Sequence, residues 1–431
     1  MSYIEVLKSI IIEGQQLLEQ ITAVPRDFVF ERNARYVFVG VRQSGKSYML
    51  YLRAGQLIRE GHSLKEMLFV NFDDERLIGF TAADFDSILK GYGELFGGRP
   101  VLFLDEIQNV EGWEHFARRL ANEKYMAYVT GSNAKMLSRD IATVLGGRYM
   151  EKYVFPYSFQ EYLLAKGLSL GPNWQYGSAR GEAQRYLGEY LNWGGFPEVN
   201  LYTNKRGWLN ELYEKIILGD IIQRNGIKNE TALRLVVKRL ADCVKTPVSY
   251  NRIAGMLKGA GTSISVSSVS DYVRYCTEAC MIFSMENFAS KFSERNAVRK
   301  HYFIDTGLLH IFLTDSETAL MENLCAITLR RKYMADREFE FYYYKKEVEI
   351  DFYIPSGKRG IQCSFSISDS VTFEREVRAL EQFHKQYGLD EAEIVTYSEE
   401  MDLSRGDLRI RVVPLVKWLV ENEGRMRGDG Y

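Results

Sequence analysis

Residues 40–47, with the sequence Gly-Val-Arg-Gln-Ser-Gly-Lys-Ser, have the spacing G-x-x-x-x-G-K-S of a phosphate-binding P-loop. The glycines let the backbone approach a phosphate closely, and a helix that follows adds partial positive charge at its N-terminus. We expect Lys46 to contact the β- and γ-phosphates and the Ser47 hydroxyl to hold Mg²⁺. The alternative is an ordinary glycine-rich turn between a strand and a helix. The motif predicts an ATP site formed by Gly40, Val41, Arg42, Gln43, Ser44, Gly45, Lys46, Ser47 and Tyr48.

Two adjacent carboxylates, Asp105 and Glu106, follow the apolar run Val-Leu-Phe-Leu that begins at residue 101. Ligands of parallel sheets bind where strands end, so both acids should lie near the P-loop. We expect Asp105 to contact Mg²⁺ and Glu106 to act as general base toward the attacking water. A complete strand–helix unit between the P-loop and Asp105 is typical of P-loop ATPases with an additional catalytic glutamate. An ordinary strand-to-loop exit is the alternative.

Three further polar residues are candidates for catalysis. Ser132 and Asn133 follow a strand expected to end at residue 130, and either side chain could hydrogen-bond the γ-phosphate or the water. A turn that caps the next helix is the structural alternative, and it could hold at the same time. Arg148 precedes the next expected strand and could reach the γ-phosphate held by a neighbouring subunit, or form a structural ion pair.

The elements that position these residues alternate between strands and helices. Apolar runs predict five strands, and helical periodicity predicts helices at 47–58, 83–96 and 135–145. This order indicates an α/β fold with a parallel sheet and helices on both faces. The expected strands are 35–39, 67–72, 101–104, 126–130 and 149–155.

The motif order resembles the AAA-type ATPase domain of a prokaryotic family whose C-terminal domain of unknown function is often described as restriction-endonuclease-like. The resemblance is carried by the P-loop, by LFLDE, VTGSN and GGR, by PYSFQEY from residue 156, and by GGFPE from residue 194. It implies a helical lid over the nucleotide, and places Gly195-Phe-Pro197 near the adenine unless these residues form only a turn. Together with pattern changes it divides the chain into an N-terminal helix (1–32), AAA-type core (33–156), helical lid (157–229), winged-helix domain (230–318) and degenerate endonuclease-like domain (319–431).

Three short helices and a hairpin are expected between residues 230 and 304, which is the outline of a winged helix. Between Lys228 and Lys300 the sequence has twelve Lys and Arg residues against six Asp and Glu. This local excess predicts DNA backbone binding with little sequence preference. The alternative is a module that packs on the ATPase or on a protein partner. The expected DNA-contacting cluster is Lys291, Arg295, Arg299 and Lys300.

The C-terminal domain has the acids Asp351 and Glu322, which the resemblance aligns with the metal-binding acids of active nucleases of this fold. The E-x-K element of those nucleases aligns with Gln362-Cys363-Ser364. Gln is a poor substitute for a carboxylate ligand, and Ser cannot replace the charge of a lysine. We therefore expect no metal-dependent cleavage. Upstream, helical periodicity predicts one helix over 209–225, on which Asp220 and Arg224 have the spacing of a surface salt bridge.

Composition limits the remaining function classes. The net charge of −2 excludes a polycation, and five scattered cysteines without a C-x-x-C pair indicate neither a disulfide framework nor a zinc site. The cysteine pattern therefore favours a reducing cytoplasm. No apolar run is long enough to span a bilayer. The expected partners are ATP and ADP, with a protein partner or copies of the chain itself. The sequence predicts a Mg²⁺-dependent ATPase switch; the alternatives are a nucleotide-bound interaction platform and, less favoured, an ATP-gated nuclease.

Overall fold

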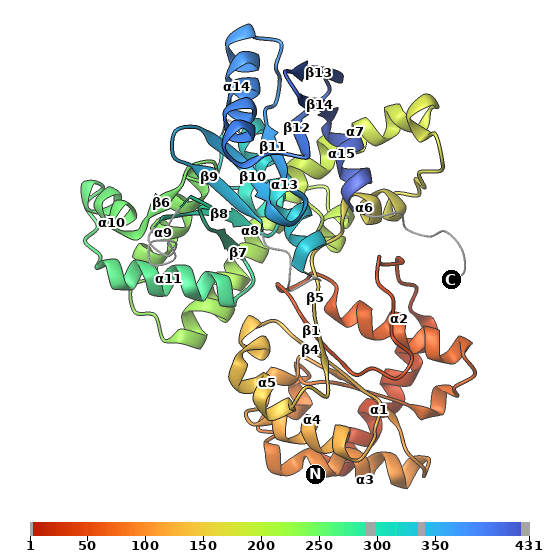
Figure 1. Ribbon diagram of the computed structural model, residues 1–431. Helices are drawn as coiled ribbons and strands as arrows, with labels where there is room; N and C mark the ends of the chain where they lie inside the picture. The colour runs from red at the N-terminus through yellow and green to blue at the C-terminus, as the bar shows by residue number, and fades with distance from the viewer. Residues whose placement is uncertain (1–2, 290–297, 315, 335–340, 424–431) are drawn as a thin grey trace. The chain divides into compact units, whose positions relative to one another are not determined.

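The computed structural model describes residues 3–289, 298–314, 316–334 and 341–423 (Figure 1). The chain divides into two compact units, which are described separately. The first unit contains residues 1–155 with 278–280, and the second contains residues 156–277 with 281–431. No helix in the described part of the chain is long and apolar enough to cross a membrane.

The first unit is built on a five-stranded sheet in the order β2-β3-β4-β1-β5, and every neighbouring pair is parallel. The predicted parallel α/β arrangement is therefore confirmed. Strand β4 lies between β1, which leads into the P-loop, and β3, which ends at Asp105. The strands are β1 (Tyr36–Val39), β2 (Met67–Asn71), β3 (Val101–Asp105), β4 (Ala127–Gly131) and β5 (Met150–Tyr153).

Alternate side chains of this sheet determine which groups face the P-loop helix. Tyr36, Phe103 and Tyr128 pack with Met49 and Leu50 of α2 in one apolar cluster. Because side chains alternate along a strand, Asp105 and Thr130 project to the same face as Phe103 and Tyr128. The helices of this unit are α1 (Tyr3–Gln20), α2 (Lys46–Arg59), α3 (Phe85–Leu95), α4 (Trp113–Asn122) and α5 (Arg139–Leu145), with short 3₁₀ turns η1 (Leu64–Glu66), η2 (Glu75–Leu77), η3 (Ala82–Asp84), η4 (Ile107–Asn109) and η5 (Ala134–Leu137).

The helix expected at 135–145 is two pieces. Turn η5 ends before Ser138, whose extended backbone and hydroxyl cap α5 by accepting the N–H of Ile141 at 3.4 Å. A serine that caps a new helix interrupts the old one, because its side chain replaces a backbone acceptor.

The helices that follow residue 156 lie in the second unit. They are α6 (Phe159–Ala165), η6 (Trp174–Tyr176), α7 (Ala179–Trp193), η7 (Pro197–Leu201), α8 (Lys205–Lys215) and the π-helix η8 (Ile216–Gln223). The expectation of one regular helix over 209–225 was wrong. The wider π-turn buries Ile216, Ile217, Asp220 and Ile221 together, so Asp220 is not a surface residue; its contact with Arg224 is 3.5 Å.

Three helices and a small antiparallel sheet come next. The helices are α9 (Glu230–Asp242), α10 (Tyr250–Gly259) and α11 (Val266–Glu278). The strands β6 (Val248–Ser249), β7 (Ile282–Met285) and β8 (Val298–Phe303) pair in the order β6-β8-β7.

The last part of the chain contains a mixed six-stranded sheet in the order β13-β14-β12-β11-β10-β9. Residues 412–423 are the end of one strand followed by a helix, and the hairpin of residues 401–414 was not predicted from the sequence. The elements are α12 (Thr306–His310), α13 (Glu317–Met334), β9 (Tyr342–Lys345), β10 (Glu349–Ile354), η9 (Pro355–Gly357), β11 (Arg359–Cys363), α14 (Ser370–Tyr387), β12 (Glu391–Thr396), β13 (Met401–Arg405), β14 (Leu408–Pro414) and α15 (Leu415–Asn422).

The buried carboxylate of Asp305 holds the turn that contains Gly195-Phe-Pro197. It accepts the N–H groups of Gly195 at 2.7 Å and of Gly307 at 2.8 Å. A side chain at Gly195 would place its Cβ 2.3 Å from the carbonyl oxygen of Tyr157, so only glycine fits. These contacts give the motif a structural role as a turn within the second unit.

Strand β8 places the neighbours Lys300 and His301 on opposite sides, and both are buried. The His301 Nδ1 lies 2.9 Å from the Ser284 hydroxyl, and its ring stacks on Tyr250. Burial, followed by the charge of Arg299, lowers the pKa of His301 to about 4.

We predict that His301 makes the second unit acid-sensitive. Because the folded pKa lies below the ordinary value, the unfolded chain takes up the proton first, and stability falls as the pH drops from about 6.5 toward 4. His301→Gln should remove about 2 kcal/mol of the stability difference between pH 7 and pH 5. Urea unfolding at both pH values measures this difference. The exposed His115→Gln serves as control, and an unchanged difference in His301→Gln would contradict the prediction.

Candidate nucleotide-binding site

The P-loop connects β1 to α2 and has the backbone that a phosphate cradle needs. Gln43 and Gly45 have left-handed backbone conformations, with φ of 61° and 94°. Such residues turn successive N–H groups toward one point. A Cβ at Gly40 would lie 2.1 Å from the carbonyl oxygen of Val154, so this glycine is required by the close approach of the strand β5 end.

Polar groups inside the loop fit a polyphosphate. The Ser44 hydroxyl is buried and has no hydrogen-bond partner within the described residues. Lys46 is also buried; its Nζ donates to the carbonyl of Val41 at 3.1 Å and lies 3.5 Å from Oε1 of Glu106. A buried hydroxyl without a hydrogen-bond partner is costly, and an anion that accepts a hydrogen bond from it would remove the cost. The loop therefore offers a hydroxyl and an ammonium group where phosphate oxygens are expected.

The two predicted Mg²⁺ ligands are neighbours. The Ser47 hydroxyl forms a hydrogen bond with the Asp105 carboxylate, because Asp105 projects to the α2 face of the sheet. Burial, followed by the charge of Glu106, raises the pKa of Asp105 to about 6, although hydrogen bonds from Thr130 and Ser47 oppose the rise. A carboxylate and a hydroxyl suit the oxygen coordination that Mg²⁺ prefers.

Glu106 directly precedes the turn η4 and has a left-handed backbone, at φ 51° and ψ 39°. This conformation is uncommon for a residue with a side chain and is often found at functional sites. Its N–H donates to the Thr130 hydroxyl at 2.9 Å, and its Oε2 accepts from Nε2 of Gln108 at 2.6 Å. Burial alone would raise the pKa of Glu106, but Lys46 and Gln108 outweigh it, and the pKa is lowered. The carboxylate is therefore ionised, as a base must be.

Of the two residues after β4 that could contact the γ-phosphate or the attacking water, Ser132 is linked to Glu106 and Asn133 is not. The buried Ser132 hydroxyl lies 3.4 Å from Nε2 of Gln108, which itself bonds Glu106. The Asn133 side chain instead accepts the N–H of Lys135 at 2.9 Å and caps η5. The geometry thus connects Ser132 to the carboxylate and gives Asn133 the capping role.

Three predicted residues remain: Arg42, Tyr48 and Arg148. Arg42 helps to lower the pKa of Glu106. Tyr48 is 42% exposed and packs edge-on against Tyr51. Arg148 is exposed; it donates to the carbonyls of Leu145 and Gly146, and no carboxylate among the described residues pairs with it.

Comparisons with known proteins agree with this geometry. Family models match an AAA domain at residues 32–163 and two domains of unknown function, DUF8612 at 184–319 and DUF4143 at 317–418. An uncharacterized protein of Methanocaldococcus jannaschii, MJ1544, is 30% identical over 95% of this chain and 94% of its own length. The chain belongs to this family of AAA-domain P-loop ATPases.

Two further matches are more distant. An uncharacterized protein of Haemophilus influenzae is 27% identical over 83% of the chain and 92% of its own length. A Walker-type ATPase of Pyrococcus abyssi has a TM-score of 0.41 and 14% identity, covering 69% of the chain and 99% of that protein. The AAA domain contains all the residues predicted for the nucleotide site and implies ATP binding.

Three residues of the AAA domain and its N-terminal approach support the site and were missed by sequence reasoning. Thr130 donates to Asp105 and accepts from Glu106, and Gln108 links Glu106 to Ser132. Arg26 is buried and donates to the carbonyls of Ser44 at 3.3 Å and Phe155 at 2.7 Å. A polar residue near a strand end could have indicated Thr130 and Gln108. For Arg26, no local pattern signals a contact across the fold.

The predicted DNA-contacting cluster is not formed as expected. Lys300 is wholly buried, and its Nζ contacts Glu322, Asp351 and Glu349, so it is unavailable to phosphates. Arg299 donates to Glu286 at 2.9 Å. Lys291 and Arg295 lie outside the described residues. The expectation for Lys300 was wrong because strand alternation turns its side chain inward.

A cavity of about 890 Å³ in the second unit is lined by three acids of the DUF4143 domain, Glu322, Glu349 and Asp351, which form its acidic centre. Gln362 and Ser364 line the same cavity. Both the oxygen and the nitrogen of the Gln362 amide form hydrogen bonds to the backbone. The oxygen accepts the N–H of Asp351 and the nitrogen donates to the carbonyl of Glu349, both at 2.9 Å. Ser364 donates to the carbonyl of Ser366. Within the described ranges, no group of three or more His, Cys, Asp or Glu residues could hold a metal ion.

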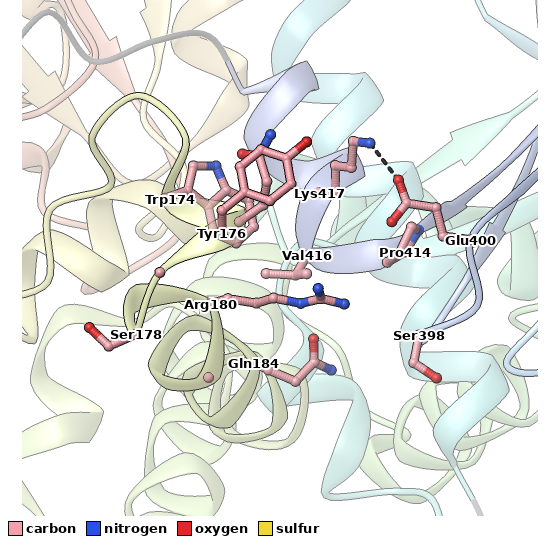
Figure 2. Close-up of a pocket in the computed structure, with 13 residues that line it drawn as sticks. Trp174, Tyr176, Ser178, Arg180, Gln184, Ser398, Glu400, Pro414, Val416 and Lys417 are labelled. Atoms are coloured by element: carbon pink, nitrogen blue, oxygen red, sulfur yellow. Dashed lines mark hydrogen bonds and ion pairs between the residues drawn. The ribbon is translucent and has the colours of Figure 1, made fainter.

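A separate cavity of about 540 Å³ in the second unit contains none of the predicted site residues. Figure 2 shows its lining, where the aromatic rings of Trp174 and Tyr176 and the side chain of Arg180 share the space with a Lys417–Glu400 ion pair of 2.6 Å.

We predict that the Thr130 hydroxyl stabilises the first unit by holding both acids. Thr130→Val keeps the shape of the side chain but removes one of the two hydroxyl donors to Asp105 and leaves the Glu106 N–H without its acceptor. The free energy of unfolding should fall by about 1–3 kcal/mol. Thr130→Ser, which keeps the hydroxyl, should lose less. Urea unfolding tests this, and equal stability of Thr130→Val and wild type would refute the bridge.

Proposed function

We propose that the protein is a Mg²⁺-dependent ATPase and that nucleotide controls its C-terminal half as a switch. One observation carries the proposal: the Ser47–Asp105 hydrogen bond and the Lys46–Glu106 contact occur side by side at the edge of the sheet. A metal-binding pair therefore lies beside a phosphate-binding cation and an ionised carboxylate. These are the four groups that phosphoryl transfer to water requires.

Nucleotide binding would use the loop backbone, Lys46 and Ser44. Phosphate oxygens would accept a hydrogen bond from the buried Ser44 hydroxyl and replace the Val41 carbonyl as partner of the Lys46 ammonium. Ser47 and Asp105 would hold Mg²⁺, which when bound neutralises charge that develops on the phosphates. Arg26 and the Gly40 contact keep the loop in place during this exchange.

Glu106 would take the proton from the attacking water. Its carboxylate accepts a hydrogen bond from Gln108 and lies near the ammonium group of Lys46. Because its pKa is lowered, the group is ionised before the reaction and can accept a proton. Ser132, which reaches Gln108, would fix the amide that orients the base. Lys46 faces Glu106 and the phosphate position together, so it can balance charge that shifts between them.

The switch hypothesis concerns the second unit. Three helices with the antiparallel order β6-β8-β7 support a winged helix, and the mixed six-stranded sheet with α13 and α14 supports an endonuclease-like domain. A lid role for residues 157–229 is proposed from the family resemblance. ATP bound at the P-loop would order this lid, and hydrolysis by Glu106 would release it.

We predict that Lys46→Ala and Glu106→Gln separate binding from turnover. Glu106→Gln keeps the shape and the Gln108 contact but cannot accept a proton, so ATP should bind while turnover falls about 100-fold or more. Lys46→Ala should weaken binding and turnover together. A fluorescent ATP analogue measures affinity, and phosphate release measures turnover.

Two exposed residues of the same unit provide matched controls, Lys90→Ala and Glu111→Gln, which should behave as wild type. Wild-type turnover that Glu106→Gln retains would reject Glu106 as the base. Tight binding with no turnover in wild type would reject the ATPase and favour an interaction platform instead.

A further inference from the structure

A buried ammonium group lies at the centre of three carboxylates in the second unit. The Nζ of Lys300 is 3.0 Å from Oε1 of Glu322, 3.1 Å from Oδ1 of Asp351 and 3.3 Å from Oε1 of Glu349. The acids come from α13 and β10, whereas the lysine comes from β8 of the small three-stranded sheet. The cluster thus joins two sheets through one cation.

Three carboxylates that converge on one point are the ligands that a hard divalent cation prefers. The observed distances are those of ion pairs, longer than the 2.0–2.6 Å that Mg²⁺ or Ca²⁺ needs. The carboxylates also have other partners. Oδ2 of Asp351 accepts the N–H of Cys363 at 2.9 Å, and Oε1 of Glu322, the atom that contacts Lys300, also accepts the Tyr302 hydroxyl at 2.8 Å. The endonuclease-like metal therefore does not fit this centre as it stands.

We infer that Lys300 is the resident cation of this acidic centre and occupies the place that a divalent metal ion would need. The centre is then a cluster of ion pairs that needs no metal and holds β8 against β10 and α13. Gln362 agrees with this role, because its amide ties Asp351 and Glu349 through the backbone and offers no carboxylate oxygen.

Electrostatics explains why the buried lysine is stable in its charged form. Burial alone would lower the pKa of Lys300, but Glu322, Asp351 and Glu349 outweigh it and raise the pKa, so the ammonium stays charged. Removal of a buried partner leaves the opposite charges uncompensated, which is strongly destabilising. Without Lys300, the three acids should accept another cation.

Lys300→Ala, which leaves room for an ion, tests the inference in the full-length protein without nucleotide. We expect a lower unfolding temperature than wild type, and Mn²⁺ at millimolar concentration should raise it by at least about 2 °C relative to EDTA. Wild type should show no such rise. Lys345→Ala is the matched control, because Lys345 pairs with the same Glu349 at 2.7 Å from the exposed side. The control should not respond to Mn²⁺, and Lys300→Ala/Asp351→Asn should lose the response.

A second measurement does not depend on the folding of the lysine variant. Titration calorimetry of wild type and Asp351→Asn with Mn²⁺ should give the same isotherm, because Asp351 holds the lysine and no metal. A Mn²⁺ site in wild type that Asp351→Asn loses would overturn the inference. So would a folded Lys300→Ala protein whose response to Mn²⁺ equals that of wild type and Lys345→Ala.

Discussion

A buried carboxylate must be held by hydrogen bonds or paired with a cation, and both acidic centres of this protein are organised by that constraint. At the edge of the first sheet, Asp105 is held by the hydroxyls of Thr130 and Ser47 and lies beside an ionised Glu106. Lys46 compensates only part of this charge, at 3.5 Å from one oxygen.

The second acidic centre is arranged around a single cation that contacts all three of its carboxylates. Lys300 contacts three carboxylates within 3.3 Å, and Tyr302 donates a further hydrogen bond to Glu322. Two lysines of the same chain thus have opposite roles. Lys46 begins α2 at the end of a glycine-rich loop whose Ser44 hydroxyl is unpaired, whereas Lys300 lies in a strand with its side chain enclosed.

Local patterns predicted the parts of the site that follow from neighbouring residues. The P-loop spacing, the apolar run before Asp105 and the alternation of strands and helices are all local, and the parallel five-stranded sheet is the expected one. Contacts between distant residues were not predictable in this way. Arg26 reaches Ser44 and Phe155 across the fold, and no periodicity in the sequence indicates such a contact. The π-turn at Ile216–Gln223 was missed because its apolar residues also suit a regular helix.

Lys300 shows why charge in a sequence is a weak guide to a binding surface. As one of four cations between residues 291 and 300 it suggested a DNA-contacting cluster, since basic residues are usually exposed. The alternation of β8 places Lys300 and Tyr302 on the same side, toward Glu322, and His301 on the other, toward Ser284. The decisive acids are 22 to 51 residues away along the chain. A charge count over a local window cannot include them, so it counts Lys300 as available although its ammonium is paired.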